Sequence, residues 1–108
     1  MTEDNKVSEL TNGEFEEFIK DGITLIDFFA EWCMPCLMLA PVVEEMSKKF
    51  DGKIKFGKVD IDSNREFAQK FGINSIPNLV VFKDGEVLEQ FVGLMSAEDL
   101  EEKLKKFI

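Results

Sequence analysis

Hydrophobic and polar residues follow one another along the chain in a pattern that predicts an α/β fold. Residues 23–30 are apolar except for Thr24 and Asp27, which is typical of a central strand covered by helices on both faces. Hydrophobic residues recur at helical spacing between residues 33 and 50, so we expect a long helix there. Residues 53–60 predict the next strand, and the three segments together form a βαβ unit.

Local signals predict the remaining elements. Thr11 and Glu14 form a capping-box pattern that begins a helix after a short edge strand at residues 6–10. Asp84-Gly85 separates two alternating segments and predicts a hairpin turn. Ser96 is a typical N-cap residue for a last helix. The predicted order is β-α-β-α-β-α-β-β-α, in which the other elements are a helix at 64–71 and strands at 78–83 and 86–92.

Composition indicates one domain and excludes several function classes. The chain has 108 residues, 44% of them hydrophobic, which is enough for a single core over residues 1–108. A net charge of -9 repels phosphate backbones and anionic lipid, so we expect no nucleic-acid and no membrane partner. The polar, acidic residues 1–6 do not read as a secretory signal, which favours a cytoplasmic protein.

Candidate chemistry lies in the segment Trp-Cys-Met-Pro-Cys at residues 32–36. Cys33 and Cys36 are the only two cysteines. A disulfide between them closes too small a loop to restrict the unfolded chain much, so reversible exchange explains the pair better than stability does. A closed zinc site needs four Cys or His ligands and the chain has no histidine, so we expect no metal. A cluster bridged between two chains is the alternative that these residues leave open.

The expected helix assigns different roles to the two cysteines. Cys33 lies at its start, where unpaired N–H groups and the helix dipole stabilise a thiolate, so we expect an exposed nucleophile. Cys36, one turn further on, is then the resolving thiol. Asp27 lies among apolar residues, and burial should raise the pKa of its carboxyl group. Such a group can take the proton of Cys36, although a satisfied structural aspartate is the alternative.

Residues 27–36 together with four later segments resemble the thioredoxin family. The later segments occur in the family's order and spacing: Lys58-Val59-Asp60, Ile76-Pro77, Phe82-Lys83-Asp84-Gly85 and Val92-Gly93. The resemblance implies the thioredoxin fold, an α/β fold with a central mixed sheet of four to five strands flanked by about four helices on both faces.

The resemblance also implies roles for single residues. Lys58 would tune proton transfer by Asp27, and Pro77 would be a cis proline that faces the cysteines. The backbone of Ile76 would bind an extended substrate segment in strand fashion. An exposed apolar surface around Cys33 would contact partner proteins, and its expected members are Trp32, Met34, Pro35, Ile76, Pro77 and Gly93.

The function that the resemblance implies is thiol-disulfide exchange by a general protein-disulfide reductase. It would need no cofactor, act as a monomer on disulfide-containing protein substrates, and be recycled by an external electron donor of the thioredoxin-reductase type. The alternatives are a disulfide oxidase or isomerase on the same fold and a thioredoxin-fold docking module.

Four residues depart from the family pattern. Met34 replaces a usual Gly, Phe29 a frequent Trp, Leu37 a common Lys or Arg, and Asn78 a usual Thr. Helical geometry places Leu37 away from the core side of its helix, so we expect it to be exposed. Our hypothesis is that Met34 and Leu37 select partners.

Overall fold

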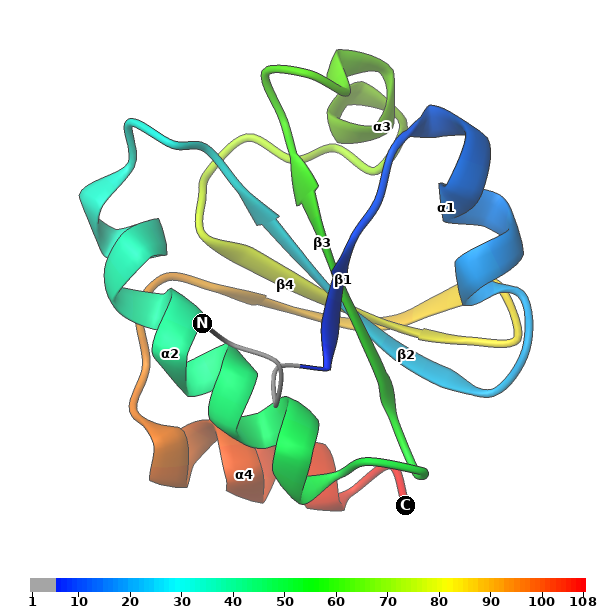
Figure 1. Ribbon diagram of the computed structural model, residues 1–108, viewed down its shortest axis with the longest axis vertical. Coiled ribbons are helices and arrows are strands. Elements are labelled where there is room, and N and C mark those ends of the chain that lie inside the picture. The colour runs from blue at the N-terminus through cyan, green and yellow to red at the C-terminus, as the bar shows by residue number, and fades with distance from the viewer. Residues whose placement is uncertain (1–5) are drawn as a thin grey trace.

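The computed structural model describes residues 6–108 and contains one five-stranded mixed sheet between two pairs of helices (Figure 1). The observed order of elements confirms the prediction. In chain order the elements are β1 (Val7–Glu9), α1 (Asn12–Ile19), β2 (Ile23–Phe29), α2 (Met34–Lys49), β3 (Lys55–Asp60), α3 (Arg65–Lys70), β4 (Asn78–Lys83), β5 (Glu86–Val92) and α4 (Ala97–Lys105).

Strand β2 lies at the centre of the sheet, whose strand order is β1-β3-β2-β4-β5. It pairs in parallel with β3 and antiparallel with β4, so Asp27 has Lys58 on one side and Leu79 on the other. Because β2 and β3 are parallel, their carboxyl ends meet at the same edge of the sheet. Helix α2 follows β2 directly and begins at this edge (Figure 1).

Each face of the sheet has its own hydrophobic core. Helices α2 and α4 cover one face, where buried leucines of β2 and β4 pack against Leu39, Val43 and Leu100. Helices α1 and α3 lie on the other face (Figure 1). The core on that side is built from aromatic rings whose centroids lie 4.4 to 6.4 Å apart, and the rings in contact are Phe15, Phe28, Phe67, Phe71 and Phe82.

The predicted hairpin turn lies at the end of the sheet opposite the start of α2. Asp84 and Gly85 both have positive φ, 51° and 89°, as a tight hairpin turn between β4 and β5 requires. The Asp84 carboxylate accepts a hydrogen bond from the Gly22 N–H at 2.8 Å, and the Asp84 N–H donates to the Gly22 carbonyl at 2.9 Å. These two bonds join the hairpin turn to the turn that precedes β2.

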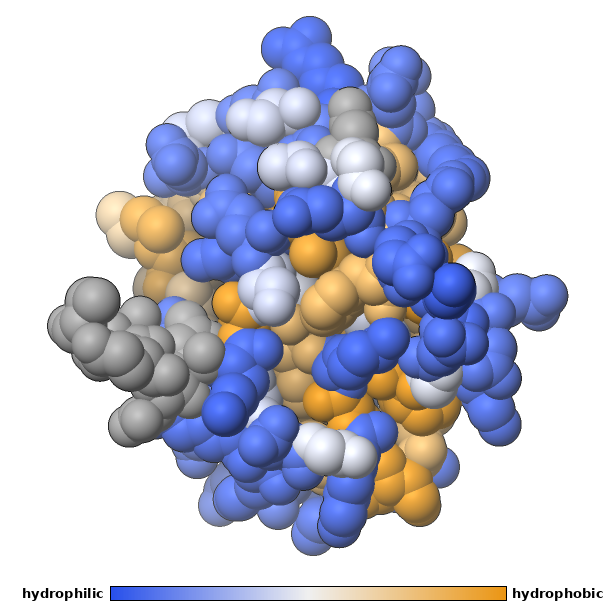
Figure 2. All heavy atoms as spheres, turned by 45° about the vertical axis from the view of Figure 1, so that its right-hand side comes forward, coloured by the Kyte–Doolittle hydropathy of each residue, from blue (hydrophilic) through white to orange (hydrophobic). Residues whose placement is uncertain are grey.

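Capping interactions fix the starts of α1 and α4. The Glu14 carboxylate accepts from the Thr11 N–H at 3.0 Å, and the Ser96 hydroxyl accepts from the Asp99 N–H at 3.1 Å. Both caps were predicted, and each satisfies an N–H that would otherwise lack a partner. Hydrophilic side chains cover most of the face shown in Figure 2, with a smaller apolar area between them.

Candidate active site

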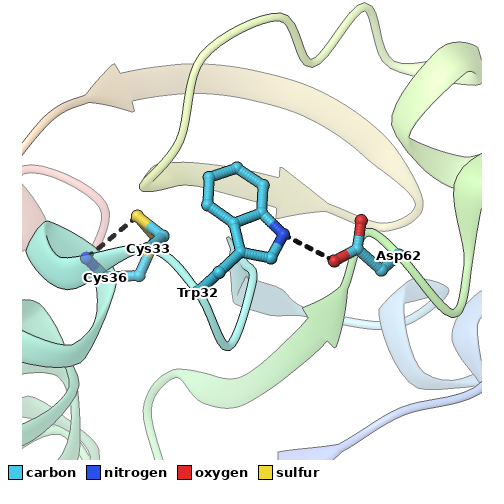
Figure 3. The surroundings of a disulfide bond; sticks show 4 residues. All are labelled: Trp32, Cys33, Cys36 and Asp62. Atoms are coloured by element: carbon cyan, nitrogen blue, oxygen red, sulfur yellow. Dashed lines mark hydrogen bonds between the residues drawn. A yellow bond between two sulfur atoms is a disulfide. The ribbon is translucent and has the colours of Figure 1, made fainter.

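The two cysteines form a disulfide in the first turn of α2. Cys33 is the N-cap residue, Cys36 lies one turn inside the helix, and their Cα atoms are 5.2 Å apart. The Cys36 N–H donates a hydrogen bond to the Cys33 Sγ at 3.2 Å (Figure 3). Pro35 suits this turn because the first turn of a helix has no intrahelical use for the N–H that proline lacks. The pair therefore lies where unpaired N–H groups and the helix dipole favour negative charge on sulfur.

Cys33 is less exposed than its position at a helix start led us to expect. Only 5% of its surface is accessible, and 2% of that of Cys36. Cys33 packs with Ala30 and Cys36 in a small cluster, against which Phe29, Ile61 and Ile76 lie partly buried. The prediction of an exposed Cys33 was wrong because residues after β3 and before β4 contribute to covering it. In this oxidised form little of Cys33 is open to a partner.

Asp27 is buried in the strand that leads to the cysteines. It is 4% exposed, and its Oδ1 has no hydrogen-bond partner. Burial raises the pKa of its carboxyl group from an ordinary 3.8 to about 7, and the nearby charge of Lys58 lowers that pKa only in part. The predicted rise in pKa is confirmed. The carboxyl group can therefore hold or release a proton near neutral pH.

Lys58 lies beside Asp27 in the sheet but forms no ion pair with it. The two residues are partners in the parallel ladder between β2 and β3. The Lys58 Nζ lies 5.5 Å from the centroid of the Phe29 ring. None of the ion pairs within residues 6–108 involves Lys58. Its charge acts on the Asp27 carboxyl group through space only.

The peptide bond between Ile76 and Pro77 is cis, as the resemblance implied. Ile76 is half-buried and packs against the cysteine cluster. Pro77 is buried, so its predicted place on the exposed apolar surface was wrong. The Pro77 carbonyl accepts the N–H of Gly93 at 2.9 Å, which extends the β4–β5 ladder by one step and places Pro77 at the end of the sheet instead of on a free loop.

An exposed apolar surface does flank the cysteines. Trp32 is 70% exposed, Met34 64%, and Leu37 51%, the last as predicted. Pro35 is exposed and Gly93 is half-exposed. Met38, which the sequence analysis did not include, is exposed as well, at 57%. Four exposed hydrophobic side chains within one short segment form a patch instead of scattered surface residues. We call these four side chains the α2 surface: Trp32, Met34, Leu37 and Met38.

Asp62 is a site residue that the sequence analysis missed. Its Oδ2 accepts a hydrogen bond from the Trp32 indole Nε1–H at 2.7 Å, so the indole lies between the disulfide and the carboxylate (Figure 3). Asp62 follows β3 and Trp32 follows β2, and parallel strands bring their carboxyl ends to one edge. That topology was predicted, and it could have placed an acidic residue beside Trp32. It does not specify whether Asp60 or Asp62 bonds to the indole.

Within residues 6–108 no group of three or more His, Cys, Asp or Glu side chains is arranged to hold a metal ion. None of the helices described there is long and apolar enough to cross a membrane.

The chemistry that this arrangement supports is the making and breaking of a bond between two sulfur atoms. A buried acid in the preceding strand can exchange a proton near neutral pH. The molecule is therefore a thiol-disulfide oxidoreductase.

Comparison with known proteins gives the family. The sequence model of the thioredoxin family matches residues 6–106. The chain is 45% identical to the thioredoxin of Staphylococcus haemolyticus over 102 residues, which cover 94% of this chain and 98% of the relative. It is 42% identical to the thioredoxin of Listeria monocytogenes over 102 residues, which cover 94% of this chain and 99% of the relative. The chain belongs to the thioredoxin family and is a protein-disulfide reductase.

Proposed function

We propose that this reductase uses Cys33 as its nucleophile and Cys36 as its resolving thiol. The Cys33 thiolate attacks a substrate disulfide, a mixed disulfide forms, and one substrate sulfur leaves as a thiolate. The Cys36 thiolate then attacks Cys33, which forms the Cys33-Cys36 disulfide and releases the second substrate sulfur. The substrate gains two electrons and the two cysteines lose them.

The position of the pair at the start of α2 carries this assignment. Once the disulfide is reduced, the Cys36 N–H that now donates to the Cys33 Sγ can stabilise a thiolate on that sulfur. Cys33 is the N-cap residue and Cys36 lies inside the helix, so the dipole acts most directly on Cys33. Cys36 is also the less exposed of the two, which suits a thiol that attacks only its neighbour.

We assign to Asp27 the removal of the proton from Cys36. It lies on the sheet face that α2 covers, because it is two residues along β2 from Leu25, which packs in the core on that face. A base works best when its pKa is near the working pH, and the pKa of about 7 meets that condition. Lys58 adjusts the proton affinity of Asp27 through its charge.

The proposed substrates are disulfide-containing proteins. The exposed apolar side chains beside the cysteines suit contact with a protein surface. Trp32, Met34, Pro35 and Gly93 would line that contact, while the backbone of Ile76 hydrogen-bonds an extended substrate segment. Pro77 is buried, so its part is to fix the course of the chain at Ile76 rather than to touch the substrate.

We further propose that the chain works as a one-domain monomer. An external donor of the thioredoxin-reductase type would return two electrons to the Cys33-Cys36 disulfide after each cycle. Net reduction of substrates suits a reducing compartment such as the cytoplasm.

A pair of single substitutions tests the assignment. Cys33→Ser should abolish turnover and trap no substrate, while Cys36→Ser should attack substrates once and accumulate mixed disulfides. Mass spectrometry of proteins retained under non-reducing conditions measures the difference. Trapping by Cys33→Ser in place of Cys36→Ser would reverse the roles.

The direction of exchange has its own test. Equilibration of the Cys33-Cys36 couple against a glutathione buffer gives its potential, and a reductase should have a potential of about −270 mV. A potential nearer to about −120 to −180 mV, the range of oxidases and isomerases, would favour one of those activities. Complex formation retained by the double Cys33→Ser, Cys36→Ser variant would reveal an additional docking role.

A further inference from the structure

Three side chains of different chemistry share one face of the sheet at the end of β2. Asp27 and Phe29 are two residues apart in this strand, so their side chains point to the same face. Lys58 is the partner of Asp27 in the parallel ladder and therefore points to that face as well. The Phe29 ring also packs against the cluster that contains both cysteines. An acid, an aromatic ring and a cation thus lie on one face of the sheet, and the ring connects them to the cluster that holds the disulfide.

The Lys58 ammonium lies over the ring and not on the acid. Its Nζ is 5.5 Å from the Phe29 centroid, within the range of a cation–π contact. The Asp27 Oδ1, in contrast, has no hydrogen-bond partner, and Lys58 takes part in no ion pair of residues 6–108. On its other side Asp27 is paired with the apolar Leu79 of β4. Lys58 is the nearby charge that lowers the pKa of the carboxyl group.

The ring and the ionised acid compete for the same ammonium group. While the carboxyl group is neutral, the electron-rich face of the ring is the better partner for a cation. When the carboxyl group ionises, an ion pair with Lys58 becomes favourable, but the ammonium group must first leave the ring. The ring therefore favours the neutral acid by the amount of the cation–π attraction.

We propose that Phe29 is a positioning residue that holds the Lys58 ammonium over its ring and away from the Asp27 carboxyl group. This inference deepens the proposed function and rests on Asp27 as the base for Cys36. Without the ring, Lys58 would pair with Asp27 and make it a weaker base. With the ring, Asp27 keeps its high affinity for a proton at the pH where the enzyme works.

The test follows the Asp27 carboxyl group by ¹³C NMR as the pH is varied. The oxidised protein is used, since disulfide-bonded cysteines do not titrate and cannot couple to the signal. Phe29→Leu should lower the titration midpoint of Asp27 by about half a pH unit, which is the size of an exposed cation–π contact. Phe29→Tyr keeps the ring and should leave the midpoint where it is.

The Phe29→Leu substitution in a protein that lacks the Lys58 charge distinguishes positioning of Lys58 from a change in packing around Asp27. Lys58→Met should raise the midpoint, because it removes the charge that lowers the pKa of Asp27. In that background Phe29→Leu should have no effect, as there is no ammonium group left to release. An equal shift in both backgrounds would mean that Phe29 acts through burial alone, and the proposal would be overturned.

A fluorinated ring at position 29 and the pH profile of activity complete the test. If Phe29→Leu fails to fold, 3,4,5-trifluorophenylalanine at position 29 weakens the cation–π attraction at nearly constant shape and should give the same downward shift; an unchanged midpoint would contradict the proposal. The pH profile of disulfide reduction is measured separately. If the midpoint moves as expected and this profile does not, Phe29 still positions Lys58, and it is the role of Asp27 as base that fails.

Discussion

At residues 27 and 28, the two faces of strand β2 bury opposite kinds of side chain. On the α1 and α3 face, Phe28 lies among aromatic rings, with the centroids of Phe15 and Phe71 6.4 and 6.3 Å from its own. On the α2 and α4 face, one residue earlier, Asp27 is almost as inaccessible but has a carboxyl oxygen without a partner. Neighbouring residues of one strand thus supply a packing group to one core and an ionisable group to the other.

This difference means that one face of the sheet contributes mainly to stability and the other mainly to reactivity. Each favourable pair of aromatic rings contributes about 0.5–1.5 kcal/mol beyond the area that it buries. A buried carboxyl group without a partner has the opposite effect, since it loses its hydration without replacement. The aromatic face should therefore respond to substitution mainly through the free energy of unfolding, and the face with Asp27 mainly through its dependence on pH.

The aromatic face should show the largest loss of stability. Phe15 is 1% exposed and contacts four other rings, so Phe15→Ala should lower the free energy of unfolding by about 3–5 kcal/mol. Chemical denaturation measures this loss. Phe18→Ala, on the same helix but half-buried, is the matched control and should cost clearly less. Equal losses at the two positions would show that the aromatic core is not special.

Removing the buried acid should stabilise the protein, but only above acidic pH. Since the folded-state pKa of Asp27 is about 7 and the ordinary value is 3.8, the folded state keeps its proton where the unfolded state has lost it. The group's contribution to stability is full below pH 3.8 and is lost as the pH rises through about 7. Asp27→Asn should therefore raise the free energy of unfolding by on the order of 4 kcal/mol at pH 8 and by nearly nothing at pH 3.

The measurement is the difference in unfolding free energy between Asp27→Asn and the unsubstituted protein across this pH range. Taking the difference cancels the other acidic groups, which titrate in both proteins. A difference that does not change with pH would contradict the raised pKa.

The tightness of the α1 side can be tested with a single methyl group. A Cβ added at Gly57 of β3 would lie 2.9 Å from a methyl carbon of Leu10 and 3.0 Å from the ring of Phe18. Gly57→Ala should therefore cost about 1–3 kcal/mol by overpacking. Gly13→Ala is the control, because nothing lies within 4 Å of its added Cβ and α1 gains a better helix former. If Gly57→Ala left the free energy of unfolding unchanged, α1 would be loosely packed against the sheet.

The smallest effect on stability is expected at the α2 surface. Leu37→Lys and Met34→Gly alter exposed side chains, so each should change the free energy of unfolding by less than about 1 kcal/mol. In the Cys36→Ser background they should nevertheless change which proteins are trapped as mixed disulfides. An unchanged profile would refute our hypothesis that these two residues select partners. Glu45→Gln, an exposed change further along α2, serves as the control.

The fold could be predicted because its signals are local. The apolar run of β2, the turn residues Asp84 and Gly85 and the cap at Ser96 each specify their own element, and short connections then leave few topologies. The raised pKa of Asp27 was predictable for the same reason, since its burial follows from the residues on either side of it in the strand.

Exposure within the site could not be predicted in this way. Cys33 is partly covered by Ile61 and Ile76, and Pro77 is held by Gly93, all of them distant in sequence. The bond between Trp32 and Asp62 likewise joins residues 30 positions apart. Hydrophobic periodicity reports which face of an element is buried, but it does not report which distant side chain completes the cover.

The spacing of the cysteines in α2 has a consequence for the catalytic cycle. Their Cα atoms are 5.2 Å apart, a separation that suits a disulfide and that the first turn of a helix provides in any case. Helix geometry alone therefore allows the bond to form and break without a rearrangement of the backbone. We expect α2 to present the same scaffold to a docked protein before and after exchange. Release of the product should then follow cleavage of the mixed disulfide rather than a movement of the helix.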